Sequence, residues 1–577
     1  MLRLYHRSLY PDKRATPHLI RYLVAVLVAL CCLSAYAQTA DPSLAKQLFE
    51  QERWPELVLL LEHVPRASAD LDYYYGVALA HLERWDEARE ALLAGEQLAP
   101  NDKRFPIELA GVAFKQKKYG EARCDLHGAL RLDPKDTHAN EFLATIYFLE
   151  GNLEAALKYW NRVGKPEIVE VRSQPALRVR PALLDHAFAF APASTLTLNE
   201  LLASQARLQG MEIFSSYKIE LAARPDGKFD AVFRAEELNG FGNSKLQILV
   251  RMFSGILFEE ITPEYYNLNG SATNIVSLAR FDVDKRRAYA GLSGPLNGNP
   301  KWRYRMAVDL RNENWTVQTS FTGPSTILAA LNLRRESMSA EISRFVGARW
   351  NWSTGFEVSH RDFRNVLDLG ALTPPLLSQG YQLKHTAKFN YELWRSPERR
   401  VTVSTGVNSQ AGRIWSQPGQ SFEKLQGLLE THWFPRAHGD DYETQWHIRG
   451  GKTFGQIPFD ELFMLGVERD NGLLLRAHVG TRHGQKGSAP LGRNYFLSNW
   501  EIDKNTYSTG LVTVKLGPFL DTGKIIDSSS TSALSPRKWL FDTGAQAKLR
   551  VLGVGVVLLY GKDLRTGNNA FYANVAW

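Results

Sequence analysis

Arg476 has the side chain and the sequence setting of a candidate ion-pairing residue. It lies in the stretch IPFDELFMLGVERDNGLLLRAHVGTR, residues 457–482, whose three glycines indicate a long loop. The nearest acidic residue is Asp470. Burial of a charged guanidinium without a partner is unfavourable by several kcal/mol. Arg476 is therefore either solvated at a surface or paired with a carboxylate from elsewhere in the fold.

Motifs for catalysis or for cofactor binding are absent from the sequence. It has no H-E-x-x-H, no G-x-S-x-G and no paired-cysteine metal spacing. The stretch HRDFRN (360–365) is similar to a kinase catalytic loop, but its asparagine is misplaced and the flanking residues alternate as in a strand. We therefore expect no catalytic residue, no metal and no cofactor. An active site built from scattered residues stays open as an alternative.

The first 37 residues are predicted to be a signal peptide. Five basic residues precede the 13-residue apolar run LVAVLVALCCLSA, and Ala35-Tyr36-Ala37 has the small-residue pattern of a cleavage site. An uncleaved membrane anchor is the alternative, but a spanning helix needs about 20 residues. Removal of this segment, with five Lys/Arg and one Asp, lowers the formal charge from +8 to +4. This small charge does not predict nucleic-acid binding. A disulfide framework is not predicted either, because Cys124 is the only cysteine left.

Residues 41–170 are predicted to form helical repeats. Small residues recur at Gly76, Ala110 and Ala144, and prolines at Pro100 and Pro134, each series with a step of 34 residues. This is the tetratricopeptide period, in which small residues lie where paired helices approach closely. Such repeats commonly bind another protein on a concave surface, which predicts periplasmic or lipoprotein partners. A spacer or a dimerisation arm is the alternative.

Residues 178–238 are predicted to form a small α+β domain. The stretch STLTLNELLASQARLQG (194–210) carries a capping box at Thr197 and Glu200 before an amphipathic helix. Two alternating runs in 214–237 then flank Pro225-Asp226-Gly227, a hairpin turn signal. Helix followed by hairpin resembles the polypeptide-transport-associated (POTRA) domain, which implies an exposed strand edge that pairs with another chain. An ordinary α+β linker domain is the alternative.

Residues 242–577 are predicted to form an outer-membrane β-barrel. Strand-like alternation is clear in KWRYRMAVDLR (301–311), WNWSTGFEVS (350–359) and YETQWHIR (442–449). Alternation alone does not separate a sandwich from a barrel, but strands near ten residues long with aromatic ends, after an export signal, favour a membrane barrel. The length predicts about 16 antiparallel strands, and 14 stays open. The fold class is therefore an all-α repeat region, a small α+β domain and a transmembrane barrel.

The chain ends in NAFYANVAW, in which Phe571, Ala573, Val575 and Trp577 share one face. A final strand with an aromatic carboxyl terminus resembles the assembly signal of bacterial outer-membrane barrels. The stretch ELFMLGVERDNGLLLRAH (461–478) is similar to the inward-folded loop of the outer-membrane insertase and two-partner secretion barrels, the BamA/TamA-like bacterial surface antigen family. Ala477 and His478 stand where that family has a glycine and an aromatic residue.

Two segments downstream of the loop also resemble this family. They are PLGRNYFLSNWEI (490–502) and GPFLDTGKI (517–525), the second with the motif whose aspartate holds the loop arginine. The resemblance implies that Arg476 pairs with Asp521 inside the barrel and fixes the loop. It also implies a lateral seam between a first strand near Lys245 to Ile256 and the final strand, Phe571 to Trp577.

The predicted function is assembly, insertion or translocation of client proteins at the outer membrane of a Gram-negative bacterium, with the N-terminal domains in the periplasm. Unfolded outer-membrane or secreted proteins would be the clients, and the lipid bilayer would surround the barrel. Two alternatives stay open. A polysaccharide export porin also joins tetratricopeptide repeats to a barrel, and a surface-lipoprotein translocon should lack the POTRA-like hairpin. An open lumen would favour sugar transport, and a lumen filled by the Arg476 loop would favour protein handling.

Overall fold

The structure is a computed structural model of the chain. It describes residues 41–62, 68–318, 325–345, 347–416, 419–436, 439–509, 512–526, 534, 538–551 and 554–576. The predicted signal peptide and Trp577 lie outside the described residues. The chain divides into two compact units, with the boundary between Ile146 and Tyr147.

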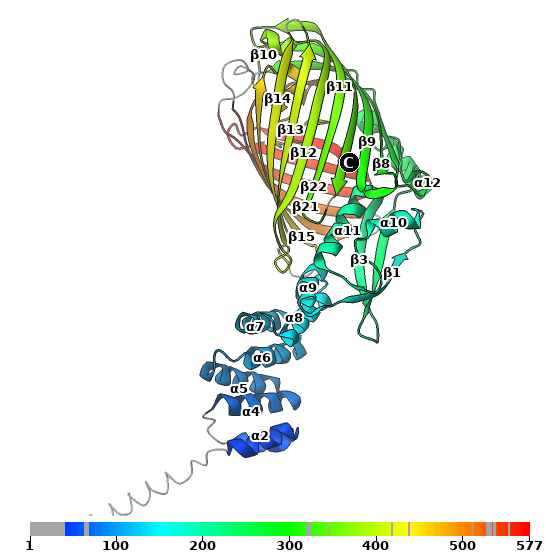
Figure 1. Ribbon diagram of the computed structural model, residues 1–577. Coiled ribbons are helices and arrows are strands. Elements are labelled where there is room, and N and C mark those ends of the chain that lie inside the picture. The colour runs from blue at the N-terminus through cyan, green and yellow to red at the C-terminus, as the bar shows by residue number, and fades with distance from the viewer. Residues whose placement is uncertain are drawn as a thin grey trace, which may run out of the picture. The chain divides into compact units, whose positions relative to one another are not determined.

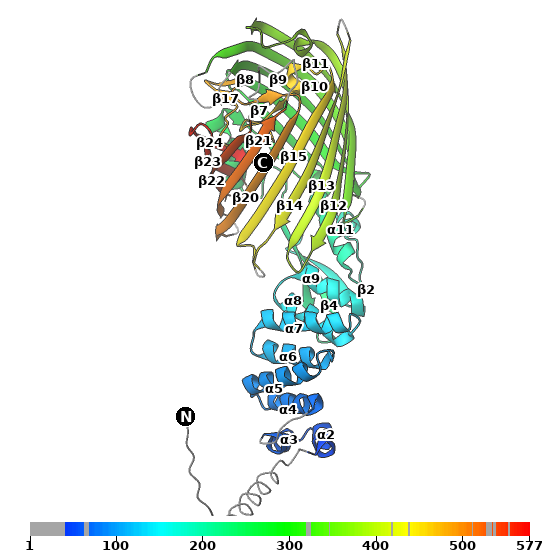
Figure 2. The ribbon, with the colours of Figure 1, turned by 90° about the vertical axis from the view of Figure 1, so that its left-hand side faces the viewer.

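The first unit consists of antiparallel helices that follow one another in chain order (Figure 2). Its helices are α2 (Pro42–Glu50), α3 (Trp54–Leu61), α4 (Ala69–His81), α5 (Trp85–Leu98), α6 (Arg104–Lys115), α7 (Tyr119–Leu132) and most of α8 (Thr137–Leu149). The small residues of the 34-residue period lie where helices touch: a Cβ at Gly76 would be 2.6 Å from Leu92 Cγ. Ala110 and Ala144 are fully buried. Close helix approach therefore explains the period.

The second unit begins with a small α+β module (Figure 1). Its elements are α9 (Leu153–Trp160), η2 (Asn161–Val163), β1 (Glu167–Gln174), α10 (Pro181–Ala187), β2 (Ser194–Thr195), α11 (Leu198–Met211), β3 (Phe214–Ala223) and β4 (Phe229–Glu237). The sheet order is β2-β1-β4-β3, with β1 and β4 parallel. The capping box of Thr197 and Glu200 begins α11, and Gly227, at φ +77°, lies in the β3–β4 turn. Strand β3 is an edge of this sheet.

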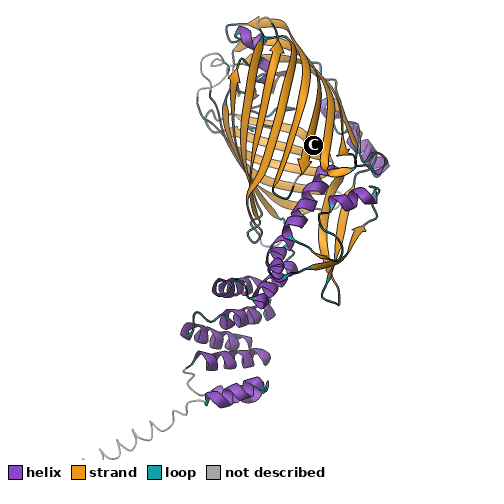
Figure 3. Ribbon diagram, in the orientation of Figure 1, coloured by secondary structure: helices purple, strands orange, loops and turns teal. Residues whose placement is uncertain are grey.

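A closed antiparallel barrel makes up the rest of the unit (Figure 3). Its long strands are β7 (Asn274–Arg280), β8 (Lys285–Leu296), β9 (Asn299–Gln318), β10 (Ile327–Phe345), β11 (Trp350–Asp368), β12 (Gly380–Ser396), β13 (Val401–Trp415), β14 (Gln420–Trp433), β15 (Tyr442–Gly455), β20 (Tyr495–Ser508), β21 (Val512–Ile525), β22 (Leu540–Val551), β23 (Val554–Asp563) and β24 (Asn569–Ala576). The short segments are β5 (Glu260–Ile261), β6 (Glu264–Tyr265), β16 (Phe463–Met464), β17 (Thr481–Arg482), β18 (Gln485–Lys486) and β19 (Leu491–Gly492). The remaining short helices are η3 (Ile256–Phe258), η4 (Leu268–Gly270), η5 (Pro374–Leu377) and η6 (Phe459–Glu461).

The barrel wall is apolar on its outside and polar on its inside. On β9, Met306, Val308 and Leu310 face outward and are 43–49% exposed, whereas Arg303 and Glu313 on the opposite face are buried. A soluble sandwich would bury its apolar face, so this inverted arrangement is that of a barrel in lipid. The long strands number fourteen in the described part of the chain, and the short segments β5, β6, β17 and β18 are also part of the ring.

The prediction of a first barrel strand near Lys245 to Ile256 is wrong. Residues Lys245–Phe253 form helix α12. Ser244 caps its N-terminus by accepting a hydrogen bond from the backbone N–H of Gln247, and apolar residues recur at helical spacing at Leu246, Leu249 and Phe253. The short β5 and β6 segments pair with β7 instead. Among the described residues, no helix has both the length and the apolar character that crossing a membrane requires.

Candidate functional site: an ion-paired loop inside the barrel

Residues 456–494 leave the sheet between β15 and β20, which pair directly with each other from Tyr442↔Lys504 to Gly451↔Tyr495. The loop contains the small β16–β19 sheet and the β17–β18 hairpin, and Lys486 of β18 pairs with Trp315 of β9. Its charged residues form ion pairs with strands around the ring: β7, β8, β9, β10, β11, β12, β14, β20 and β21. His478 of the loop makes a hydrogen bond with Asp542 of β22. A segment that contacts strands on all sides of a closed barrel lies in its lumen.

Arg476 and Asp521 are in direct contact. The Arg476 guanidinium donates from Nε to Asp521 Oδ2 at 2.9 Å and from Nη2 to Oδ1 at 2.7 Å, and the Arg476 backbone N–H donates to Oδ2 at 3.0 Å. Its Nη1 donates to Glu501 Oε2 at 2.6 Å and to Gln546 Oε1 at 2.8 Å. Arg476 is 3% exposed and Asp521 fully buried. The arrangement is a bidentate, desolvated ion pair, and the centroid of the Phe519 ring lies 4.0 Å from the guanidinium carbon.

The two residues after Arg476 are bound by a second carboxylate. Asp542 accepts the backbone N–H of Ala477 at 2.6 Å, and its Oδ2 is 3.0 Å from Nδ1 of His478. Nε2 of His478 is 3.9 Å from Asp563. His478 therefore binds by polar contacts at the position where the resembled family has an aromatic residue. The backbone also passes close to the wall: a Cβ at Gly561 would lie 2.6 Å from the Arg476 carbonyl oxygen.

Asp470 forms a second anchor, which the sequence did not reveal. Arg280 donates to Asp470 Oδ2 at 2.9 Å, and Arg287 donates to Oδ1 at 2.5 Å. Lys486, itself 2.7 Å from Glu313, is 3.9 Å from the same carboxylate. The two arginines, on β7 and β8, precede Asp470 by 190 and 183 residues. No local pattern connects such distant positions.

Asp460 and Glu461 form a third anchor at the start of the loop, which the sequence analysis also does not predict. Glu461 accepts from Lys384 at 2.9 Å and from Lys424 at 3.1 Å. Asp460 lies 3.2 Å from Arg335 and 3.3 Å from Arg361. One signal is present in the sequence: an acidic pair in a loop, together with cations on the polar faces of alternating strands. It does not specify which residues pair.

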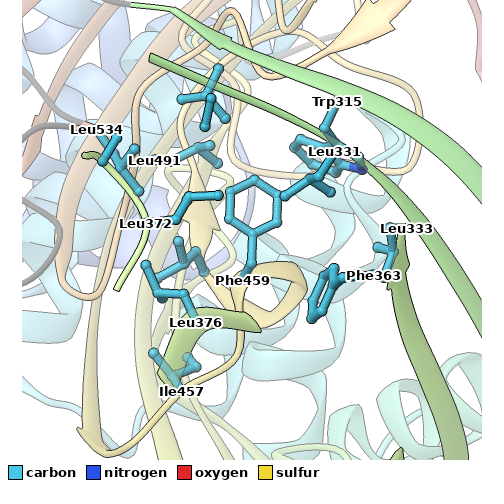
Figure 4. Packing of buried hydrophobic residues seen from close by; sticks show 14 of the residues in the cluster. Trp315, Leu331, Leu333, Phe363, Leu372, Leu376, Ile457, Phe459, Leu491 and Leu534 are labelled. Carbon is cyan, nitrogen blue, oxygen red and sulfur yellow. The ribbon is translucent and has the colours of Figure 1, made fainter. Parts of the chain in front are cut away.

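An apolar cluster packs the same part of the loop against the barrel (Figure 4). Phe459 lies at its centre, and its ring meets that of Trp315 edge to face, with centroids 5.1 Å apart. The surrounding residues come from β10, β11 and the connection between β11 and β12: Leu331, Leu333, Phe363, Leu372 and Leu376. Burial of these side chains stabilises the inward position in addition to the ion pairs.

A cavity of about 540 Å³ remains between the loop and the wall. Phe463 and Leu473 line it from the loop, and Lys388, Asn390 and Asn408 line it from β12 and β13. The lumen is thus partly filled at the level of the loop.

Phe571, Ala573 and Val575, three of the four predicted seam residues, lie on β24, which pairs antiparallel with β23 and precedes β5 in the ring. Phe571 faces outward with 68% exposure, and Ala573 is half-buried. Val575 pairs with Val556 through the backbone, but its side chain lies outside the described residues, as does Trp577 entirely. Because Lys245 to Ile256 is not a strand, the ring closes between β24 and the short β5–β6 segments.

Comparisons with known proteins agree with the predicted repeats. The tetratricopeptide-repeat family model matches residues 107–166, which confirms the predicted repeats there. No curated protein sequence matches the chain.

Three of the solved structures that are similar to the chain are those of one BamA and two CdiB proteins. BamA from Haemophilus ducreyi lacking POTRA domains 1-3 has 10% identity and a TM-score of 0.40, over 71% of this chain and 83% of that one. CdiB from Escherichia coli has 13% identity and a TM-score of 0.44, over 72% and 74%. CdiB from Acinetobacter baumannii has 10% identity and a TM-score of 0.41, over 74% and 82%.

Proposed function

We propose that this protein assembles, inserts or translocates client proteins at the bacterial outer membrane. The observation that carries the proposal is the loop of residues 456–494, which occupies the lumen and is fixed there by the Arg476–Asp521 pair. A barrel whose lumen is occupied by its own loop is poorly suited to passive flow of a solute. It is suited to a controlled reaction in which a client passes through or along the wall.

The proposed location of the barrel follows from its surface. Outward-facing apolar side chains such as Met306, Val308 and Phe356 match the acyl-chain region of a bilayer. A cleaved signal over residues 1–37 would deliver the chain to the periplasm, and assembly into the outer membrane would leave the N-terminal domains there.

The small α+β module is the proposed entry point for clients or partner proteins. It is docked on the barrel: Arg303 and Arg305 of β9 each donate to Glu212 at 2.7 Å. Arg395, near the end of β12, donates to Glu154 of α9 at 2.8 Å. The edge of β3 is the place at which an extended segment of another chain would pair, as the resemblance to a POTRA domain implies. The tetratricopeptide repeats would add a second protein-binding surface.

The alternative of a polysaccharide export porin requires an open lumen. Three ion-paired anchors and an apolar cluster hold the loop in that space, and displacing them would be unfavourable by more than thermal energy. The occupied lumen therefore favours protein handling over passive sugar export.

Single-channel conductance in planar bilayers tests the occupied-lumen proposal. The wild-type protein should conduct weakly, and Arg476→Ala should produce larger or more frequent openings, because Asp521 loses its bidentate partner. Arg364→Ala, which removes an exposed arginine paired with Asp362, is the matched control and should behave as the wild type. A wild-type pore that is already wide, and that Arg476→Ala leaves unchanged, would contradict the proposal.

A second experiment separates protein from sugar as the transported material. The gene would be deleted in its host bacterium and complemented with the wild type or with Arg476→Ala. Loss of particular outer-membrane or secreted proteins on deletion, with incomplete restoration by the variant, is expected. Loss of an exported polysaccharide with an unchanged protein profile would identify the porin alternative instead.

A further inference from the structure

The third anchor contains more positive than negative charge. Four cations on the inner wall, Arg335, Arg361, Lys384 and Lys424, face three carboxylates, Glu357, Asp460 and Glu461. We call these seven residues the inner-wall cluster. Its contacts are short: Lys384 is 2.9 Å from Glu461 and 3.3 Å from Glu357, and Lys424 is 3.1 Å from Glu461. One positive charge in the cluster has no matching carboxylate.

Much of the cluster is buried, although Arg335, Lys424 and Asp460 also line the cavity between the loop and the wall. Arg361 is fully buried, and Lys384 and Glu461 are nearly so. The charged groups that pair with the cluster are all members of it, so no further acid on the described strands neutralises the fourth cation. A buried charge without a partner is strongly unfavourable, and proteins normally neutralise it.

Several hydrogen-bond donors at this place have no acceptor among the described residues. They are Nε and Nη1 of Arg361, Nε of Arg335, Nε2 of Gln382 and the hydroxyl of Ser359. Both oxygens of Asp460 also lack a hydrogen bond, so a small rotation would pair them with two of these donors. Three donors would still remain. Buried donors of this kind are rare in native proteins. Each one gives up the hydrogen bonds that it makes with water in the unfolded chain and gains none in return.

The strand register brings these donors together. Ser359 of β11 lies opposite Gln382 of β12, and Arg361 of β11 lies opposite Arg335 of β10. Arg361 Nη2 donates to Gln382 Oε1 at 2.7 Å, so the amide nitrogen of Gln382 is also beside the guanidinium. Cationic and neutral donors from three adjacent strands thus converge around Arg361.

We propose that the inner-wall cluster binds one monovalent anion, of the chloride class, at Arg361. The anion would accept hydrogen bonds from Arg361, Gln382 and Ser359, and it would neutralise the fourth cation. This would keep Arg361 and Arg335 oriented toward Asp460, so anion binding and the inward position of the loop stabilise each other. The proposal does not depend on the function proposed above, since it concerns only the charge balance of the lumen.

Bromide soaking of crystals of the full chain tests the site directly. An anomalous bromide peak within hydrogen-bond distance of the Arg361 guanidinium and the Gln382 amide is expected. Density at that place without an anomalous signal would show that water satisfies the donors, and would overturn the proposal.

Thermal unfolding in detergent tests the linkage in solution. At constant ionic strength, replacing gluconate by chloride should raise Tm by at least about 2 °C, because a ligand that binds only the folded state stabilises it. An unchanged Tm would count against the anion site.

Gln382→Glu is the decisive variant, because its carboxylate would take the place of the anion beside Arg361. The chloride dependence of Tm should disappear in this variant. Its Tm in gluconate should be at least as high as the Tm of the wild type in gluconate. Gln445→Glu is the matched control, since Gln445 lies on β15, a strand that carries no residue of the inner-wall cluster. It should retain the chloride dependence. A Gln382→Glu variant with undiminished chloride dependence would place the anion elsewhere and contradict the assignment.

Discussion

Arg476 and Asp521, 45 residues apart in the chain, form a buried bidentate ion pair that joins the tip of the luminal loop to β21. Asp521 also accepts from Nδ2 of Asn499 at 2.8 Å. Both oxygens of the carboxylate are thus occupied by donors from the loop and from β20. The pair is part of a network in which the position of each donor depends on the others.

The strength of this pair is measurable by a double-mutant cycle of Arg476→Ala and Asp521→Asn. Each single change should destabilise the closed loop by about 3–5 kcal/mol, because each leaves a buried charge without its partner. The destabilisation of the closed loop in the double variant should be smaller than the sum of the two single destabilisations, by a coupling free energy of about 1–3 kcal/mol. Hydrogen exchange of the amides of residues 474–478 in detergent reports the local opening free energy.

Glu501→Gln provides a comparison within the same network, because Glu501 binds Arg476 through one oxygen only and also pairs with Lys548. Its coupling to Arg476 should be weaker than that of Asp521. Additive effects of Arg476→Ala and Asp521→Asn would show that the two side chains act independently, and the pair would then not be what holds the loop tip.

Gly561→Ala should displace the loop tip without changing any of its side chains. The new methyl group would lie 2.6 Å from the Arg476 carbonyl oxygen and 3.0 Å from the Ala477 nitrogen, and backbone atoms there cannot yield as a flexible side chain can. Bilayer conductance should therefore increase, as is also expected for Arg476→Ala. Gly427→Ala on β14 is the control, because no heavy atom lies within 4 Å of the place that its methyl group would take. Wild-type conductance in Gly561→Ala would show that the tip tolerates a shift.

The sequence is sufficient to locate Arg476 and Asp521 because each lies in a short motif that resembles a known family. The alternating strands and the 34-residue repeats are also predictable, since both periods arise from local geometry. The partners of Asp470 and Glu461 are not predictable from the sequence. Their cations are distributed over β7, β8, β10, β11, β12 and β14, and only barrel closure brings those strands around the loop.

Residues 245–253 show a different reason for error. The strand prediction for this stretch rests on its place at the start of the barrel, although its apolar residues are spaced as in a helix. Ser244 as an N-cap and the 246, 249, 253 spacing are both present in the sequence. The N-cap and the apolar spacing therefore predict the helix correctly, whereas the expectation of a barrel strand at this place gives the wrong element.

Helix α12 should lie with its apolar side in lipid. Leu246, Leu249 and Phe253 are 48–61% exposed on one side, whereas Arg251 on the other is buried with its guanidinium 5.6 Å from the Tyr266 ring centroid. A spin label at Leu249→Cys, in a cysteine-free background and in nanodiscs, should be accessible to oxygen and shielded from a water-soluble nickel complex. Gln247→Cys, about half a turn away, is the control and should show the reverse preference. Equal accessibility at both positions would contradict lipid contact.

Glu212 should hold the small α+β module against the barrel. Its carboxylate accepts from Arg303 and from Arg305 at 2.7 Å each, and Arg303 is buried. Glu212→Ala leaves the Arg303 guanidinium without its counter-ion, at a loss of about 1–3 kcal/mol. Spin labels at Ala222→Cys on β3 and Thr509→Cys after β20 would give the distance distribution between module and barrel.

This distribution should be narrow in the wild type and broad in Glu212→Ala, because the module loses a charged contact and Arg303 becomes free to reorient. Glu220→Ala is a matched control: Glu220 pairs with Lys218 and Arg234 inside the module and should leave the distribution narrow. Equal widths in all three proteins would mean that the remaining contacts, such as Arg395 with Glu154 and Phe345 against Gly210, suffice to dock the module. A broad wild-type distribution would mean that it is not docked in solution, and the proposed entry point for clients would then lack a fixed position beside the lumen.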